Sequence, residues 1–138
     1  MGLVLSVLFI ILSHEHLMNH IFFVFIGGGI GSVLRFLLSK YMTSNFTHIN
    51  PIATLSSNVL ATLILAFLMY FIHDKNPMDL GWKFFAVTGI CGGFSTFSTF
   101  SYETYELFKL NMPIYAILNV TVSIALVLIV MYLMSRLA

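Results

Sequence analysis

The amino-acid sequence predicts an all-α membrane protein with four transmembrane helices, the third of which is broken. Three observations lead to this prediction. The chain of 138 residues is 59% hydrophobic and only 8% charged, whereas soluble domains carry about 25% charged residues. Four stretches are apolar over about 20 residues each, which is the length that spans a bilayer. The third stretch also contains glycines and hydroxyl residues that a uniformly apolar helix would lack.

The predicted spans occupy residues 21–38, 51–72, 82–108 and 113–137. Pro51 and Pro113 stand at the start of the second and fourth spans, where a missing N–H costs no hydrogen bond. The chain therefore divides into an N-terminal extension, residues 1–20, and a four-span domain, residues 21–138.

The extension contains an apolar run that is too short to span a membrane, residues 3–12. It has no basic region at its start and no small-residue cleavage site after it, which argues against a signal peptide. Two interpretations stay open. The extension is an interfacial segment, or translation begins at Met18.

Charge and cysteine content exclude several kinds of function. The net charge is +1, so there is no basic surface for nucleic acid. Cys91 is the single cysteine, so neither an intrachain disulfide nor a cysteine-based metal site can form. The sequence has no P-loop and no evident catalytic dyad, and we therefore expect no enzyme.

The most informative segment lies in the third span at residues 92–101 and reads Gly-Gly-Phe-Ser-Thr-Phe-Ser-Thr-Phe-Ser. Backbone groups freed by a helix break inside a bilayer need partners in protein, water or an ion, because lipid offers none. Phe97 and Phe100 share a helix face, so their positively polarised ring edges could approach one anion. We expect this segment to line an ion site, with ordinary packing as the alternative for each phenylalanine.

Two other spans carry polar side chains four residues apart, which places each set on one helix face. These stripes are Thr54, Asn58 and Thr62 in the second span and Tyr115, Asn119 and Ser123 in the fourth. No carboxylate lies deep in the first, second or fourth span, so the acidic ring of a cation pore is missing. The stripes predict a neutral lining for a small anion, with interhelical hydrogen bonding as the structural alternative.

Lysine and arginine are balanced between the two predicted sides of the membrane. One side has Lys75, Lys83 and Arg136, and the other has Arg35, Lys40 and Lys109. Because an excess of positive charge normally sets orientation, this balance gives no preferred one. Copies inserted in both directions can pair about a two-fold axis in the membrane plane. We expect an antiparallel, dual-topology homodimer, with a chance balance as the alternative.

The third-span segment, continued to Glu103, resembles the signature of the CrcB/Fluc family of fluoride channels, which reads close to G-G-F-T-T-F-S-T-F-S-x-E. The one departure is Ser95 in place of threonine. Residues 27–36 broadly match the first-span pattern of the family, and the second span keeps Asn58 in a looser match. Asn119 stands where the family usually has serine. The resemblance covers residues 22–137.

The resemblance implies an antiparallel dimer with two fluoride pores, each lined by both subunits. Phe97 and Phe100 would surround the ion, and Asn58 would donate to it. The polar track would continue through Ser98, Thr99, Tyr115, Asn119 and Ser123. A structural sodium ion on the two-fold axis would be held by the backbone carbonyls of Gly92 and Ser95.

The resemblance also implies roles for two charged residues. Arg35 is expected beside an anion-attracting vestibule, with interfacial snorkelling as the alternative. Glu103 takes part in ion passage or pairs at the dimer interface. The implied activity is passive export of cytoplasmic fluoride across the inner (plasma) membrane of a bacterium, which reduces fluoride toxicity. A heterodimer of related subunits stays open, and selectivity over chloride does not follow from the sequence.

Two other classes of function fit less well. A small multidrug antiporter is also a four-span dual-topology dimer, but it needs a carboxylate deep in its first span, and residues 27–34 contain none. A membrane scaffold without transport would explain the packing glycines but not the polar stripes on two further spans.

Overall fold

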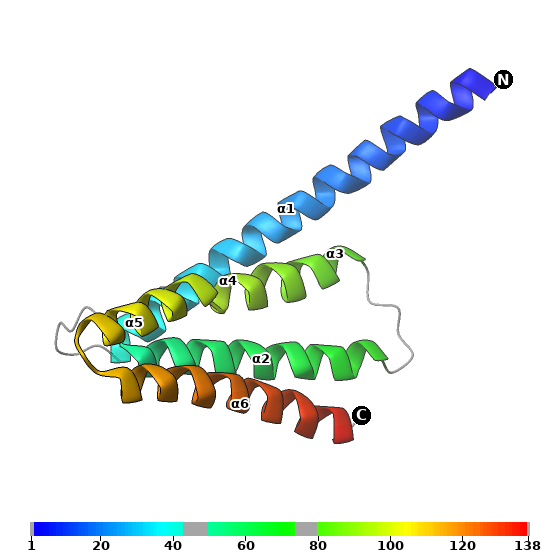
Figure 1. Ribbon diagram of the computed structural model, residues 1–138. Helices are drawn as coiled ribbons and strands as arrows, with labels where there is room; N and C mark the ends of the chain where they lie inside the picture. The colour runs from blue at the N-terminus through cyan, green and yellow to red at the C-terminus, as the bar shows by residue number, and fades with distance from the viewer. Residues whose placement is uncertain (1, 43–49, 74–79, 138) are drawn as a thin grey trace.

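The computed structural model is helical throughout the residues it describes, which are 2–42, 50–73 and 80–137, with side chains from residue 17 onward outside 71–73. Three long helices are α1 (Gly2–Met42), α2 (Pro51–His73) and α6 (Pro113–Leu137). A fourth, broken rod contains α3 (Leu80–Lys83), η1 (Phe84–Cys91), α4 (Gly92–Phe94) and α5 (Phe97–Lys109). Figure 1 shows α2 beside α6, with the broken rod on the other side of α2.

The predicted broken helix is confirmed. α2 and α6 begin at Pro51 and Pro113, as the sequence predicts. Among the described residues, three helices are long and apolar enough to cross a membrane: Leu17–Met42, Pro51–Tyr70 and Pro113–Leu137. The predicted third span is not one of them because Ser95 and Thr96 interrupt it. The chain is therefore an all-α membrane protein, and its four-span topology stays a prediction.

α1 runs without interruption through residue 20, where the sequence predicts a domain boundary. Its 41 residues reach about 60 Å at 1.5 Å per residue, roughly twice the hydrocarbon thickness of a bilayer. The N-terminal part of α1 extends away from the other helices (Figure 1). The backbone of the extension is thus continuous with the first span. The boundary at residue 20 and the translation start at Met18 stay predictions.

α1 and the broken rod pack backbone against backbone through glycines. A Cβ atom on Gly27 would collide with the carbonyl oxygen of Phe85. A Cβ atom on Gly31 would collide with the carbonyl oxygen of Ile90 and approach the nitrogen of Phe94 to 2.8 Å. Small residues allow such close approach in membrane bundles. The contact therefore holds the segment that leads into the break directly against α1.

α5 ends in a tight reversal that brings the chain back to α6. Asn111 has a φ of 57°, a left-handed conformation that asparagine tolerates better than most residues. The nitrogen of Met112 donates to Leu107 O at 2.9 Å, and that of Asn111 donates to Phe108 O at 3.1 Å. These two bonds form a Schellman motif. The short linker predicted between the third and fourth spans is thus confirmed.

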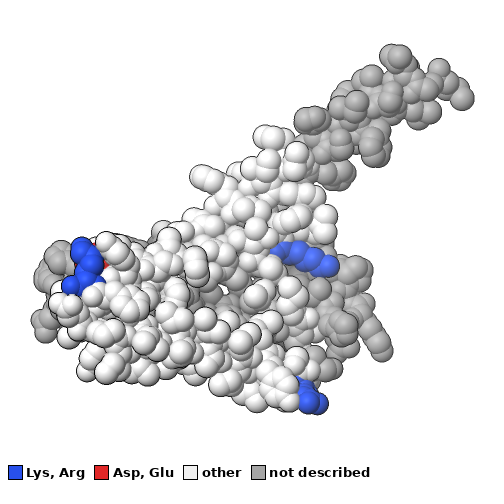
Figure 2. Space-filling model, viewed as in Figure 1, with Lys and Arg blue, Asp and Glu red and all other residues white. Residues whose placement is uncertain are grey.

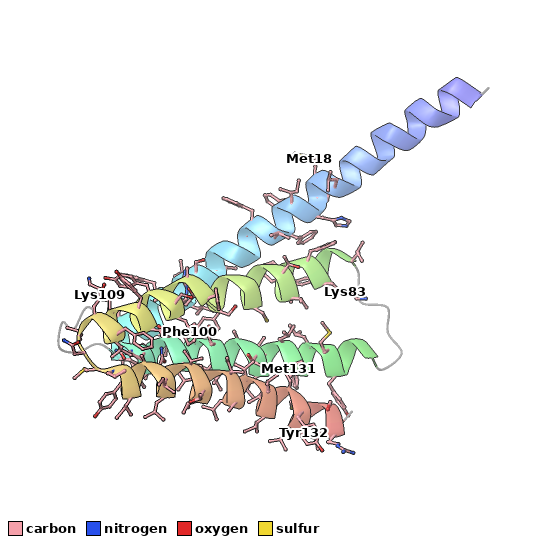
Figure 3. The ribbon with its side chains drawn as sticks, in the orientation of Figure 1. Met18, Lys83, Phe100, Lys109, Met131 and Tyr132 are labelled. Atoms are coloured by element: carbon pink, nitrogen blue, oxygen red, sulfur yellow. The ribbon has the colours of Figure 1, made fainter. Side chains whose placement is uncertain are left out.

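One face of the bundle carries its charged side chains at the ends. On the face shown in Figure 2, lysine and arginine occur at the ends, with a broad uncharged surface between them. Lys83 and Lys109 lie at opposite ends of the broken rod (Figure 3). Lys109 pairs with Glu106 at 3.0 Å. Lys75, which enters the predicted charge balance, lies outside the described residues.

The glycine contact predicts a difference between two neighbouring substitutions in α1. Gly31→Ala should lower the free energy of unfolding by about 1–3 kcal/mol, because the new methyl group collides with backbone that cannot give way. Gly29→Ala is the matched control, since a Cβ atom there meets nothing within 4 Å and alanine favours helix. Thermal unfolding of the two purified variants in detergent measures the difference. Equal midpoints would contradict this account of the packing.

Candidate functional site

The site begins at the two residues that interrupt the third span. Ser95 has φ −75° and ψ 155°, and Thr96 has φ −149° and ψ 119°, so both are extended. An interruption of this kind leaves backbone groups at the end of α4 and the start of α5 without their helical partners. In an apolar setting each such group is costly until it is hydrogen-bonded. The next contacts supply those partners.

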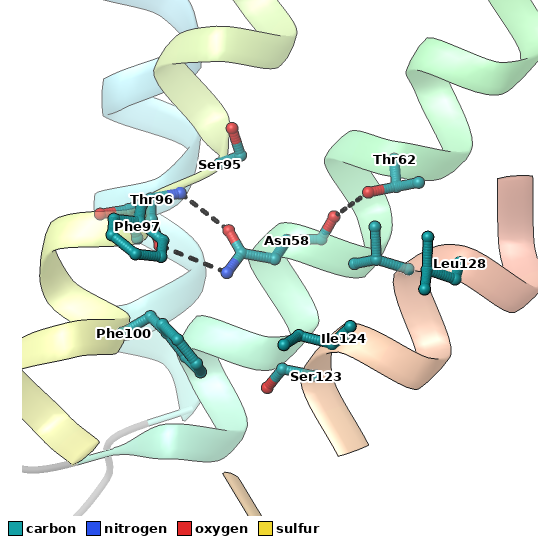
Figure 4. Close-up of a pocket in the computed structure, with 10 residues that line it drawn as sticks. Asn58, Thr62, Ser95, Thr96, Phe97, Phe100, Ser123, Ile124 and Leu128 are labelled. Atoms are coloured by element: carbon teal, nitrogen blue, oxygen red, sulfur yellow. Dashed lines mark hydrogen bonds between the residues drawn. The ribbon is translucent and has the colours of Figure 1, made fainter. Parts of the chain in front are cut away.

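Asn58 of α2 holds Thr96 by two hydrogen bonds. The nitrogen of Thr96 donates to Asn58 Oδ1 at 2.7 Å, and Asn58 Nδ2 donates to the carbonyl oxygen of Thr96 at 3.3 Å (Figure 4). One amide side chain therefore satisfies both backbone groups of an extended residue. Because Nδ2 carries two hydrogens, one N–H of Asn58 is left for a further acceptor.

Two more contacts fix the ends of the break. The hydroxyl of Thr96 accepts a hydrogen bond from the nitrogen of Thr99 at 3.2 Å and so caps the N-terminus of α5. Arg35 Nε donates to the carbonyl oxygen of Gly93 at 3.3 Å. The half-buried Arg35 side chain thus reaches the break, in contrast to the snorkelling alternative, and its vestibule role stays a prediction.

Of the predicted sodium ligands, Ser95 lies in this break and Gly92 begins the helix α4 that leads into it. None of the bonds just described uses the carbonyl oxygen of Gly92 or Ser95. Carbonyl oxygens at the end of a discontinuous membrane helix are ligands that coordinate Na⁺. The chemistry of this donor set therefore fits the ion, and its presence stays a prediction.

A pocket of about 400 Å³ opens beside the break, between α2, α5 and α6 (Figure 4). We name it the phenylalanine pocket, and it is lined by Asn58, Thr62, Ser95, Thr96, Phe97, Phe100, Ser123, Ile124, Val127 and Leu128. The ring centroids of Phe97 and Phe100 lie 5.9 Å apart. Four predicted pore residues thus meet in one pocket: Asn58, Phe97, Phe100 and Ser123.

The other predicted residues of the fourth span lie in a second, mainly apolar groove of about 410 Å³ between α2 and α6. Tyr115 and Asn119 line it together with Ser123, which borders both hollows. Asn119 Nδ2 donates to Thr104 Oγ1 at 2.9 Å. Asn119 therefore makes the interhelical hydrogen bond that was the structural alternative for the polar stripes.

A third hollow, of about 220 Å³, lies on the α1 side of the break. We name it the arginine pocket, and it is lined by Ser32, Arg35, Phe36, Ser39, Ala53, Thr54, Ser57, Thr96 and Thr99. Thr99, predicted for the pore track, belongs to this pocket and not to the phenylalanine pocket. Ser98 lines neither pocket, and its hydroxyl oxygen lies 3.4 Å from that of Thr96.

Comparison with known protein families identifies the family of the chain. A family model described as CrcB-like protein, Camphor Resistance (CrcB), matches residues 22–134. The chain belongs to the CrcB family. The match nearly coincides with the range over which the sequence resembles that family, and the resemblance is thus confirmed.

Relatives of this CrcB protein carry the names of channels. It is 35% identical over 113 residues to the fluoride-specific ion channel FluC of Flavobacterium psychrophilum, covering 79% of this chain and 88% of the relative. It is 34% identical over 124 residues to fluoride-specific ion channel FluC 1 of Yersinia pseudotuberculosis, covering 87% and 97%. A shorter match to FluC of Proteus mirabilis is 44% identical over 73 residues and covers 53% and 58%. The expectation that the chain is not an enzyme is confirmed at the level of the family.

Among the residues whose side chains the structure describes, Glu103 is the buried acid of this CrcB chain, at 4% exposure. The hydroxyl of Thr54 donates to Glu103 Oε1 at 2.9 Å. This bond connects α5 to the polar stripe of α2, so Glu103 has a partner within its own chain. Its expected roles in ion passage or dimer pairing stay predictions.

Thr96 belongs to the segment 92–101 that the sequence predicts to line an ion site, but the sequence gives it no separate role, although three contacts at the break of this CrcB chain involve it. A threonine directly before an amphipathic run is a usual N-cap signal, and that signal was available. The identity of its partner could not be predicted in this way, because Asn58 lies 38 positions away in the chain.

The paired bonds predict how the break responds to loss of Asn58. Asn58→Ala should speed hydrogen exchange at the backbone amide of Thr96 by about tenfold or more, because that N–H loses its acceptor. Thr62→Ala is the control, since the hydroxyl of Thr62 only bonds the carbonyl oxygen of Asn58 one turn earlier. Exchange measured by NMR or mass spectrometry reports the result. Unchanged exchange in Asn58→Ala would show that other groups hold the break.

Proposed function

We propose that this chain is a fluoride-specific ion channel that lets cytoplasmic fluoride leave the cell passively. Membership of the CrcB family and the names of the relatives support a fluoride channel. The phenylalanine pocket carries the proposal, because it gathers two phenyl rings, the remaining N–H of Asn58 and the hydroxyl of Ser123. Neutral donors suit conduction, which requires binding strong enough for entry yet weak enough for release.

The functional unit would be an antiparallel, dual-topology homodimer of four-span chains. In the single chain Phe97 is 80% exposed at the mouth of the phenylalanine pocket. A second copy in the opposite orientation would cover this ring and complete the pocket, so that each pore is lined by both subunits. A two-fold axis in the membrane plane relates such copies. The balanced charges support this arrangement, and a heterodimer with a related subunit is the alternative outcome.

The remaining predicted residues would extend the pathway and stabilise its centre. The polar track on either side of the phenylalanine rings would include Ser98, Thr99, Tyr115, Asn119 and Ser123. Arg35 would attract anions to the entrance, and Glu103 would assist passage or dimer pairing. A sodium ion bound by the carbonyls of Gly92 and Ser95 would supply a fixed positive charge at the dimer axis.

The proposed role is protection of a bacterium from fluoride at its inner membrane. Uncharged HF crosses a bilayer, ionises in the more alkaline cytoplasm and leaves fluoride trapped there. A channel lets the anion leave down its electrochemical gradient without ATP. An inside-negative potential assists this exit by about 2.3 kcal/mol per 100 mV for each charge.

The proposal predicts fluoride efflux from liposomes that contain the purified protein, measured with a fluoride electrode. Phe97→Ile should slow efflux by about tenfold or more while the protein stays dimeric, because the polarised ring edge is lost. Phe25→Ile is the matched control, since Phe25 is 77% exposed on α1 and lies outside the phenylalanine pocket. If folded wild-type protein releases fluoride no faster than empty liposomes, the channel proposal is wrong.

Dual topology predicts that the C-terminus of α6 reaches both sides of the membrane. A cysteine introduced as Ser135→Cys, in a Cys91→Ser background, should react with an impermeant maleimide for roughly half of the molecules in intact spheroplasts. The rest should react after the membrane is opened. Adding lysines after residue 138 should shift the labelled fraction. Labelling of nearly all molecules from one side in the starting protein would favour a single orientation.

A further inference from the structure

The phenylalanine pocket and the arginine pocket lie on different sides of the break and share one lining residue, Thr96. The phenylalanine pocket is formed by α2, α5 and α6 together with the break, whereas the arginine pocket is formed by α1, α2 and α5. Thr96 therefore borders both hollows. In Figure 4 its side chain lies next to Phe97 and opposite Asn58.

The arginine pocket suits an anion that has left bulk water. Arg35 supplies a positive charge, and the lining includes the hydroxyl groups of Ser32 and Thr99, whereas those of Thr54 and Ser57 donate to Glu103 Oε1 and Ala53 O. Guanidinium Nε of Arg35 is used by Gly93 O, and the guanidinium has four further N–H donors. Such donors can form the hydrogen bonds to an anion that water forms in solution. The phenylalanine pocket, by contrast, has a mainly apolar wall.

An anion that moves between these hollows needs a hydrogen-bond donor at their junction, because a desolvated charge without a partner is costly. Thr96 provides a hydroxyl there. It accepts from the nitrogen of Thr99 and donates to Thr99 Oγ1 at 3.0 Å, and because a hydroxyl hydrogen rotates about its C–O bond, the same proton can turn from Thr99 Oγ1 to a passing ion. The Thr99 hydroxyl, which lines the arginine pocket, then keeps its own proton for another acceptor. The linked hydroxyls of Thr96 and Thr99 thus place polar groups between the two pockets.

We propose that Thr96 is a pore residue at the junction of the two pockets, and that a fluoride ion passing between the arginine pocket and the phenylalanine pocket contacts its hydroxyl. The inference rests on the proposed fluoride channel. It adds a route past the break and a residue that neither the polar stripes nor the phenylalanine motif singled out.

The test compares three substitutions in the full-length protein by fluoride efflux from liposomes. Thr96→Val keeps the shape of the side chain but removes the hydroxyl, and it should slow efflux by about tenfold or more. Thr96→Gly also removes the hydroxyl, but glycine is a tolerable N-cap, and it should be similarly slow. Thr96→Ser keeps the hydroxyl and should stay within about threefold of wild type.

Thr121→Val is the control, because Thr121 is exposed on α6 and its hydroxyl bonds a carbonyl oxygen of its own helix. Thermal unfolding and size-exclusion chromatography follow folding in every variant. One result would overturn the proposal: Thr96→Gly conducts fluoride at the wild-type rate, while Thr96→Val is slow and unfolds at a lower temperature. That result would assign Thr96 to helix capping alone. Equal loss in Thr96→Ser and Thr96→Val would also overturn it. Absence of efflux from the wild-type protein would instead contradict the channel proposal itself.

Discussion

The structure depends on the double hydrogen bond between Asn58 and Thr96. A chain that interrupts a helix in an apolar environment must satisfy the freed backbone groups within the protein. Asn58 does so for both groups of the extended residue Thr96, at 2.7 and 3.3 Å. Without this contact, both backbone groups of Thr96 in the wall of the phenylalanine pocket would lose their partner on α2. The polar stripe of α2 is thus a structural requirement of the break as well as a candidate lining for an ion.

The glycine contact between α1 and the broken rod makes a second hydrogen bond to the break possible. Because Gly27 and Gly31 bring α1 into backbone contact with η1 and α4, the side chain of Arg35, one turn further along α1, reaches the carbonyl oxygen of Gly93. A bulkier interface would keep the guanidinium away from the break. The break is therefore held from two directions, by α2 through an amide and by α1 through a guanidinium.

Most of the fold could be predicted because its signals are local. Apolar length, proline positions and the glycine and hydroxyl cluster located α2, α6 and the interrupted third span. Of the candidate site, Phe97, Phe100 and Asn58 were found from spacing and from the family motif. Thr96 was predicted only as part of the segment 92–101, because its contact with Asn58 joins positions 38 apart in the chain. The bond between the amide of Asn119 and Thr104 was not predicted, because spacing reveals a helix face but not the donor or acceptor that faces it, and the pore role of Asn119 stays a prediction.

The break also separates backbone carbonyl groups from backbone N–H groups. This separation matters for the sodium and fluoride ions that we propose to bind there. α4 ends with carbonyl oxygens, the negative end of a helix dipole, and α5 begins with N–H groups, the positive end. Asn58 and the Thr96 hydroxyl take up amides on the α5 side, whereas Arg35 takes up a carbonyl on the α4 side. Gly92 and Ser95 keep carbonyl oxygens suited to a cation. The phenylalanine pocket adjoins the first turn of α5, where an anion is favoured. The sodium ion and the fluoride ion that we propose would therefore use different ligands at one interruption and would not compete for them.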